Sequence, residues 1–239
     1  MKASLPLFIL CFFATTYTFG QKLEVGVQLN SGVSCFGGES AASETRLIYY
    51  PNYPGPKGIT EKSYGSKLSA TYGISAQVQQ VFSSNFLVGA QAGVESLRSN
   101  VNINRVEEYR NNSLRVFEAE GSTERRYDLI NVAPYVGRRV NAGAFDVDVT
   151  LGTDLGLAFH AEENAKATYA NGEEASSKYE LSTSKLDVRP RIGAAAYYHS
   201  FGLSLSYAHG LTNYMQNYDG ANPEVYMRVL RVGLIYKIK

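Results

Sequence analysis

Ten charged side chains stand at alternating positions inside otherwise apolar segments of this chain. Carboxylates and guanidinium groups placed in this way could form ion pairs, hold a metal ion or relay protons. Neither calcium-loop spacing nor a cluster of His, Cys and carboxylate residues with metal-ligand spacing occurs, so we predict no metal and no cofactor. The charged residues are Glu24, Glu95, Arg139, Asp146, Asp148, Asp154, Asp187, Arg189, Arg191 and Arg231.

The segment that carries three of these carboxylates shows which kind of element must position them. Successive side chains of a β-strand point to opposite faces, and residues 145–159 alternate between apolar and polar or small residues. The pattern predicts a long strand with one apolar wall and one charged face. The apolar positions are Phe145, Val147, Val149, Leu151, Leu155, Leu157 and Phe159.

Eight such alternating segments follow one another along the chain, and short and long connections alternate between them. The short connections are Ser83 to Asn85, Asn141 to Gly143, and His199 with Ser200. Short turns at one end and long loops at the other are typical of an up-and-down barrel. The segments cover residues 23–29, 68–78, 86–94, 130–136, 145–159, 186–198, 201–207 and 226–238.

Periodicity alone does not decide which face of such a barrel meets the surroundings. A soluble barrel that binds a ligand in its lumen would alternate too, with its apolar face inside. Three features favour an apolar outer wall: small polar residues such as Ser204 and Ser206 on the opposite face, aromatic residues such as Phe145 and Phe159 at the ends of apolar faces, and a last strand that ends on Ile238. We therefore predict an all-β fold, an eight-stranded antiparallel up-and-down transmembrane β-barrel with short periplasmic turns and long extracellular loops.

With the apolar face outward, the ten charges face the lumen. Placing Val140 opposite Phe145 sets Arg139 beside Asp146, and a similar register brings Asp154 near Arg191. Because an unpaired charge in a narrow barrel would be costly, we predict a network of ion pairs that closes the lumen. An ion- or proton-conducting path is the alternative, although an eight-stranded barrel has room for little beyond its own side chains.

The first twenty residues resemble a secretory signal peptide, with an apolar stretch of about ten residues and a cleavage site after Gly20. We expect residues 1–20 to be removed and residues 21–239 to form one barrel domain. Without Lys2, the 23 basic and 22 acidic residues become 22 and 22, a balance that does not favour binding to nucleic acid. Cys35 would be the one cysteine of the mature chain, which excludes an internal disulfide.

Three long connections would form the extracellular loops. The first, residues 36–66, contains Tyr49, Tyr50 and Tyr53 among prolines and glycines, a composition that could serve recognition or could cover the barrel mouth. Residues 102–123 and 161–180 are polar and charged. We predict solvated loops there, with Glu162, Glu163, Glu173 and Glu174 facing water.

Catalysis is tested most directly at the histidines. The surroundings of His209 faintly resemble those of lipid A deacylases, but Leu211 stands where a nucleophilic serine is expected. His160 lies at a segment end, and His199 lies in a short turn. We therefore predict that the chain is not an enzyme, with a lipid-modifying enzyme and a small-solute channel as the alternatives.

Residues 23–32, 205–213 and 229–236 resemble the outer-membrane β-barrel family that includes PorT-like proteins. The resemblance implies a porin-like barrel in the outer membrane of a Gram-negative bacterium, usually without catalysis, and some members assist a secretion and gliding apparatus. We expect a structural or interaction role, in adhesion or as a secretion accessory, carried by the extracellular loops. The expected partners are outer-membrane lipids, with other envelope proteins or an extracellular ligand as further possibilities.

Overall fold

A computed structural model describes residues 21–111, 113–182, 186–216 and 223–238, and the predicted signal peptide lies outside these ranges. The described residues form eleven strands. The described residues include no helix that is long and apolar enough to cross a membrane. The strands are β1 (Lys22–Gly37), β2 (Glu44–Tyr49), β3 (Gly58–Thr60), β4 (Lys67–Val81), β5 (Phe86–Arg110), β6 (Ser113–Ala142), β7 (Phe145–Tyr169), β8 (Glu174–Glu180), β9 (Leu186–Tyr198), β10 (Phe201–His209) and β11 (Tyr226–Lys237).

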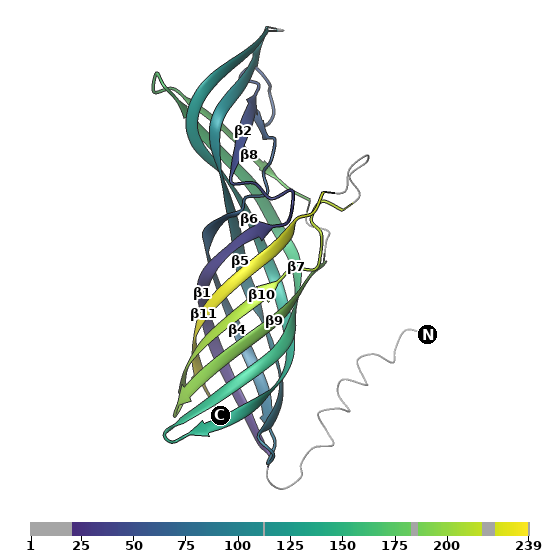
Figure 1. Cartoon of the computed structure of the whole chain (residues 1–239), viewed down its shortest axis with the longest axis vertical. Coiled ribbons are helices and arrows are strands. Elements are labelled where there is room, and N and C mark those ends of the chain that lie inside the picture. Colours follow the sequence, from purple (N-terminus) through teal and green to yellow (C-terminus); the bar gives the residue numbers. More distant parts are fainter. Residues whose placement is uncertain (1–20, 112, 183–185, 217–222, 239) are drawn as a thin grey trace, which may run out of the picture.

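Eight of these strands close into a barrel, seen in the lower part of Figure 1. Its order is β1-β4-β5-β6-β7-β9-β10-β11, and β11 pairs with β1 to close the ring. Every neighbouring pair in the ring is antiparallel. The predicted eight-stranded up-and-down barrel is confirmed.

Tight turns join β4 to β5, β6 to β7 and β9 to β10 at one end of the barrel. Each contains a residue with positive φ, Asn85 at 61°, Gly143 at 66° and His199 at 52°. Glycine and asparagine adopt this left-handed conformation at the lowest cost, which suits tight hairpin loops. The loops after β6 and β9 have two residues each, and the loop after β4 has four. The chain enters β1 and leaves β11 at this same end.

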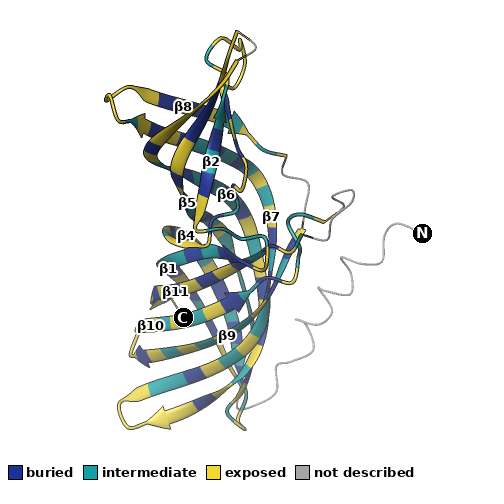
Figure 2. Cartoon of the chain, turned by 45° about the horizontal axis from the view of Figure 1, so that its top comes forward, coloured by how far each residue is buried: buried dark blue, intermediate teal, exposed yellow. Residues whose placement is uncertain are grey.

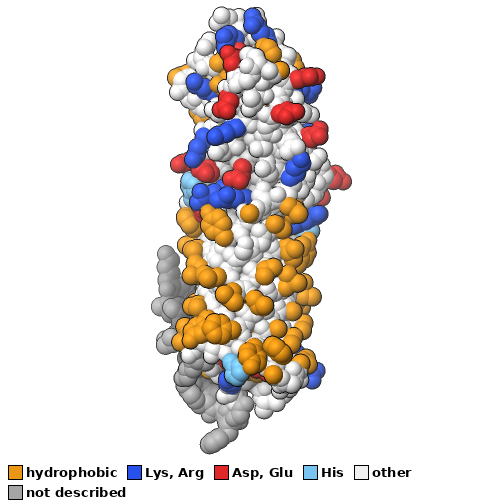
Figure 3. All heavy atoms as spheres, turned by 90° about the vertical axis from the view of Figure 1, so that its left-hand side faces the viewer, with side chains coloured by type: hydrophobic (Ala, Val, Ile, Leu, Met, Phe, Trp, Pro, Cys, Tyr) orange, Lys and Arg blue, Asp and Glu red, His pale blue; other side chains and the backbone are white. Residues whose placement is uncertain are grey.

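The apolar faces of the strands point outward. Leu151 and Leu203 are each 63% exposed, whereas the lumen-facing Asp154 and Arg189 are fully buried. Exposed and buried residues alternate along the strands in Figure 2, and hydrophobic side chains cover the face of the barrel seen in Figure 3. A surface of this kind is stable against lipid hydrocarbon rather than against water.

The two polar connections predicted as loops are strands instead. Residues 102–110 continue β5, residues 113–123 begin β6, and residues 161–180 hold the end of β7 and the whole of β8. The three strands β5, β6 and β7 therefore run on beyond the barrel mouth, where β2 pairs with β5 in parallel and β8 pairs with β7. We call β2, β3, β8 and the protruding parts of β5, β6 and β7 the extension (Figure 1).

The extension has an apolar core of its own. Leu47 of β2 and Val106 of β5 are fully buried there, together with small residues such as Ala165 and Ala175. The two ends of its sheet meet where Ser177 Oγ donates to the carbonyl oxygen of Gly58 at 2.8 Å. Burial of each large aliphatic side chain stabilises the extension by about 1.5–3 kcal/mol.

Candidate functional site

At the short-turn end of the lumen, Arg139 of β6 is held between two buried carboxylates. Its Nε donates to Asp148 Oδ1 at 2.7 Å, and its Nη1 donates to Glu24 Oε1 at 2.8 Å. Lys237 Nζ lies 3.0 Å from Glu24 Oε2. We call these four residues the inner ion cluster. Its two cations balance its two carboxylates, which offsets the cost of burying them.

The predicted register at the adjacent turn is wrong by two residues. Val140 pairs with Val147 rather than with Phe145, because Gly143 allows a two-residue turn in place of a longer one. A shift of two keeps every side chain on its predicted face. It brings Arg139 opposite Asp148 and leaves Asp146 at the rim, 3.8 Å from the Arg139 guanidinium.

Farther along the lumen, three arginines surround two carboxylates. Glu95 accepts from Arg231 Nη2 at 2.8 Å and from Arg189 Nη2 at 2.6 Å. Asp154 lies 2.9 Å from Arg231 Nη1 and 3.2 Å from Arg191 Nη1, the residue near which the sequence places it. With Asp187, which lies 3.4 Å from Arg189, these residues form what we call the outer ion cluster. Three cations there face three carboxylates.

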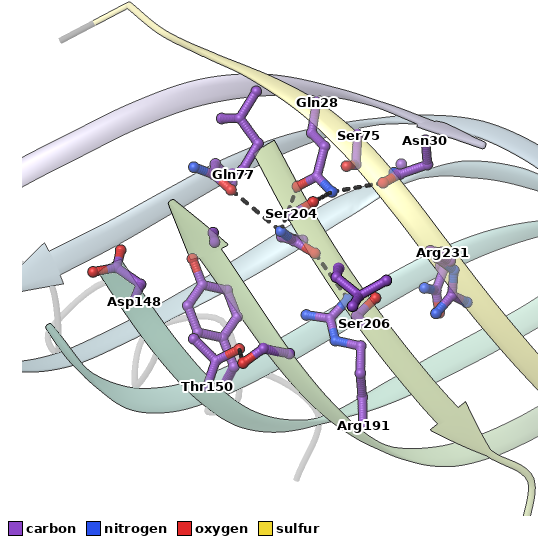
Figure 4. A pocket seen from close by; sticks show the side chains of 18 of the residues that line it. Gln28, Asn30, Ser75, Gln77, Asp148, Thr150, Arg191, Ser204, Ser206 and Arg231 are labelled. Atoms are coloured by element: carbon purple, nitrogen blue, oxygen red, sulfur yellow. Dashed lines mark hydrogen bonds between the residues drawn. The ribbon is translucent and has the colours of Figure 1, made fainter. Parts of the chain in front are cut away.

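A layer of amide and hydroxyl side chains separates the two clusters (Figure 4). Gln91 receives a hydrogen bond from Arg191 at 2.8 Å and donates to Gln28 Oε1 at 2.9 Å. Gln28 in turn donates to Ser204 Oγ at 2.9 Å. These side chains surround a cavity of about 60 Å³, which has room for a few water molecules and no larger solute.

An aromatic layer, made of Phe36, Tyr64, Tyr127 and Tyr214, lies above the outer ion cluster. The ring centroids of Phe36 and Tyr64 are 5.0 Å apart, and those of Tyr127 and Tyr214 are 5.4 Å apart, both in edge-to-face arrangement. The Tyr214 hydroxyl donates to Asp187 Oδ2 at 2.8 Å and so joins the layer to the cluster below it. Ion pairs, amides and aromatic rings thus follow one another along the whole lumen.

The three loop tyrosines named from the sequence have different surroundings. Tyr49 is half-buried against the extension core. The ring of Tyr50 stacks on that of Tyr109 of β5 with centroids 5.1 Å apart, and Tyr53 is 57% exposed. Two of the three therefore present their rings to solvent, at the end of the extension far from the barrel.

A cleft of about 730 Å³ opens between the extension and the barrel mouth, lined in part by Tyr64, Tyr179 and Arg125. Arg125 is buried. Its guanidinium lies 3.9 Å from the centre of the Tyr64 ring, and its Nε donates to Glu163 Oε2 at 2.8 Å. Burial and the neighbouring charge of Glu163 raise the pKa of Tyr179 above its usual range, so its hydroxyl stays protonated.

Arg125 and Glu163 are the main residues that sequence reasoning missed. Glu163 falls in the segment 161–180, predicted as a solvated loop, and Arg125 lies just after the predicted loop 102–123. Glu163 is nevertheless fully buried and paired with Arg125. The prediction of water-facing Glu pairs is therefore wrong for Glu163, whereas Glu173 and Glu174 are exposed. The available signal was that Glu163 shares one strand face with Ala161 and Ala165, which are buried. Alanine gives it too little hydropathy contrast to stand out.

His209, the centre of the enzymatic alternative, faces outward at the end of β10. Its Nδ1 lies 3.3 Å from the Tyr207 hydroxyl, and Leu211 beyond it is 61% exposed. Within the described ranges no serine hydroxyl hydrogen-bonds with His209, and no group of His, Cys, Asp or Glu residues could hold a metal ion. Chemistry by a serine nucleophile at this position has no arrangement to support it.

A closed antiparallel barrel with an apolar outer band and a charged, filled lumen defines a transmembrane β-barrel of the outer-membrane class. The sequence comparison agrees. The chain matches the family described as outer membrane protein beta-barrel domain over residues 18–216, and it belongs to that family. The narrower resemblance to PorT-like proteins is not part of this match.

Solved structures show weaker likenesses. The attachment invasion locus protein Ail of Yersinia pestis, solved in complex with the heparin analogue sucrose octasulfate, is 12% identical, with 91% of this chain and 99% of that chain covered and a TM-score of 0.34. Neisserial surface protein A is 8% identical, with 90% and 97% covered and a TM-score of 0.38. At these values the likenesses carry no argument about function. No curated protein matches the sequence.

Proposed function

We propose that this outer-membrane barrel is a structural and interaction component that binds an extracellular partner through its extension. The observation that carries the proposal is the length of β5, β6 and β7, which have 25, 30 and 25 residues and leave the barrel as one ordered sheet. A strand needs about 9–11 residues to cross the membrane, so much of each strand serves the extension. The filled lumen supports a role outside the barrel rather than solute passage through it.

The end of the extension supplies a surface suited to recognition. Tyr50, Tyr53 and Tyr109 are 37%, 57% and 40% exposed, and Leu114 and Val116 are 50% and 58% exposed. Tyrosine provides contact area at low cost in conformational entropy, and exposed apolar side chains grouped outside the membrane band favour a protein contact. We call these five residues the extension tip.

The experiment places a photo-crosslinking amino acid at the extension tip of the full-length protein in intact cells. Position 53 carries the probe, and position 173, in the exposed turn between β7 and β8, carries it in the matched control. The proposal expects a discrete adduct from position 53 that is absent from position 173 and that L114S/V116S abolishes. Identical adducts from both positions, or none from position 53, would contradict it.

Adhesion and a secretion-accessory role remain two forms of the same proposal. The secretion-accessory form rests on the resemblance of short segments to PorT-like proteins. The identity of the adduct separates them, because an adhesin would capture a host or matrix component and an accessory would capture a protein of the bacterial envelope.

A further inference from the structure

Two cationic or titratable side chains form a row at the outer edge of the apolar band. Arg228 of β11 and His209 of β10 are cross-strand partners, and both face away from the lumen. Two residues closer to the membrane centre, Leu230 of β11 pairs with Tyr207 of β10. Both side chains also face outward, and they are 43% and 42% exposed. Arg228 and His209 thus lie one step beyond the last apolar row of these two strands.

The height of this row matches the boundary of the membrane. Arg228 precedes Ile238, an exposed apolar residue at the short-turn end, by ten residues (238 − 228). Ten residues of antiparallel strand span about 33 Å, which corresponds to about 25 Å along the membrane normal at a tilt of about 40°. The apolar band of outer-membrane barrels has this height, so Arg228 reaches the level of the lipid head groups.

Arg228 differs from the other arginines at this level in having no carboxylate partner among the described residues. Arg126 makes two hydrogen bonds to Asp128, at 2.7 Å and 3.0 Å, and Arg98 lies 3.8 Å from Glu124. The Arg228 guanidinium instead lies over Gly37, where a Cβ atom would come within 2.3 Å of Cζ. The missing side chain at Gly37 makes room for the guanidinium beside the backbone.

We propose that Arg228 and His209 bind the phosphate group of a phosphorylated lipid in the outer leaflet. A guanidinium at the edge of hydrocarbon needs an anionic partner, and its planar set of donors fits phosphate oxygens. His209 adds a second donor, and the exposed wall of Leu230 and Leu205 below the row accepts the acyl chains. The occupant is a lipid rather than a soluble phosphate, because this wall continues directly below the donors.

The test uses the folded full-length barrel in nanodiscs of phosphatidylcholine with a minor share of phosphatidic acid, a lipid with a phosphomonoester. Native mass spectrometry counts the phosphatidic acid molecules that remain on the protein. The variant is R228Q. The control is R98Q, which removes an ion-paired arginine at the same level.

We expect R228Q to weaken phosphatidic acid retention about tenfold, H209Q to weaken it less, and R98Q to retain the lipid as the wild type does. R228K should restore part of the retention, and gel mobility of the unheated protein verifies folding of every variant. Equal retention by wild type and R228Q would overturn the proposal. Displacement by excess inorganic phosphate would overturn the assignment to a lipid and leave a site for the free anion.

Discussion

The substitution R139M should destabilise the barrel more than any removal of a surface charge. Arg139 is 5% exposed and donates four hydrogen bonds to Glu24 and Asp148, at 2.7 to 2.8 Å. Methionine has similar bulk but no charge and no donor. Asp148 would keep the hydrogen bond from Gln79, at 3.0 Å, but would lose its charged partner. Removing one partner from a buried ion pair costs about 3–5 kcal/mol, and we expect a loss of this size in the free energy of unfolding.

The assay is urea unfolding of the barrel in lipid vesicles. The chain has no Trp, so the folded fraction is followed by gel mobility of the unheated protein. The control R98M removes an ion pair of the outer surface and should cost less than about 1 kcal/mol. The variant E24Q/R139M/D148N/K237M, which removes every charge of the inner ion cluster, should be more stable than R139M. A loss below about 1 kcal/mol for R139M, or an equal loss in the fourfold variant, would refute the reasoning.

Three further predictions concern the lumen and the extension. The wild-type protein in planar bilayers should give no conductance steps above background, because the cavity between the clusters is only about 60 Å³, and regular steps would contradict the closed lumen. L47A removes a fully buried side chain from the extension core and should destabilise the extension by about 2–5 kcal/mol, seen as faster proteolysis of the extension with unchanged barrel mobility on gels. The hydrogen bond from Lys178 lowers the pKa of Glu162, so this carboxylate stabilises the pairing of β7 and β8 above its unfolded-state pKa near 4.5 and loses the effect as pH falls through its lower folded-state pKa. The protection factors of the β8 amides against hydrogen exchange should therefore fall on acidification less in E162Q than in wild type.

The barrel follows from the sequence because its signal is local. Residues two apart on one strand share a face, so Leu203 and Leu205 predict an outer wall and Arg189 and Arg191 predict a lumen without knowledge of any partner strand. Register is less local. The register of β6 against β7 depends on whether the turn near Gly143 holds two residues or four. The two-residue turn changes the cross-strand partner of Arg139 from Asp146 to Asp148 and leaves Arg139 on its predicted face.

The extension could not be predicted in the same way, for two physical reasons. Its core is rich in alanine, as at Ala119, Ala165 and Ala167, so polar and apolar faces differ little in hydropathy. Its strand β2 pairs in parallel with the outer part of β5, more than fifty residues away, as in the pairing of Leu47 with Val106. No local pattern encodes such a contact.

The central claim, a barrel in the outer membrane with the extension outside the cell, is tested most directly by labelling intact cells with a membrane-impermeant maleimide. In a C35S background, Y53C reports on the extension tip and N141C reports on the end of β6 beside the turn to β7. We predict that Y53C is labelled in intact cells and that N141C is labelled only after the outer membrane is permeabilised. Labelling of N141C in intact cells, with Y53C protected, would contradict the account.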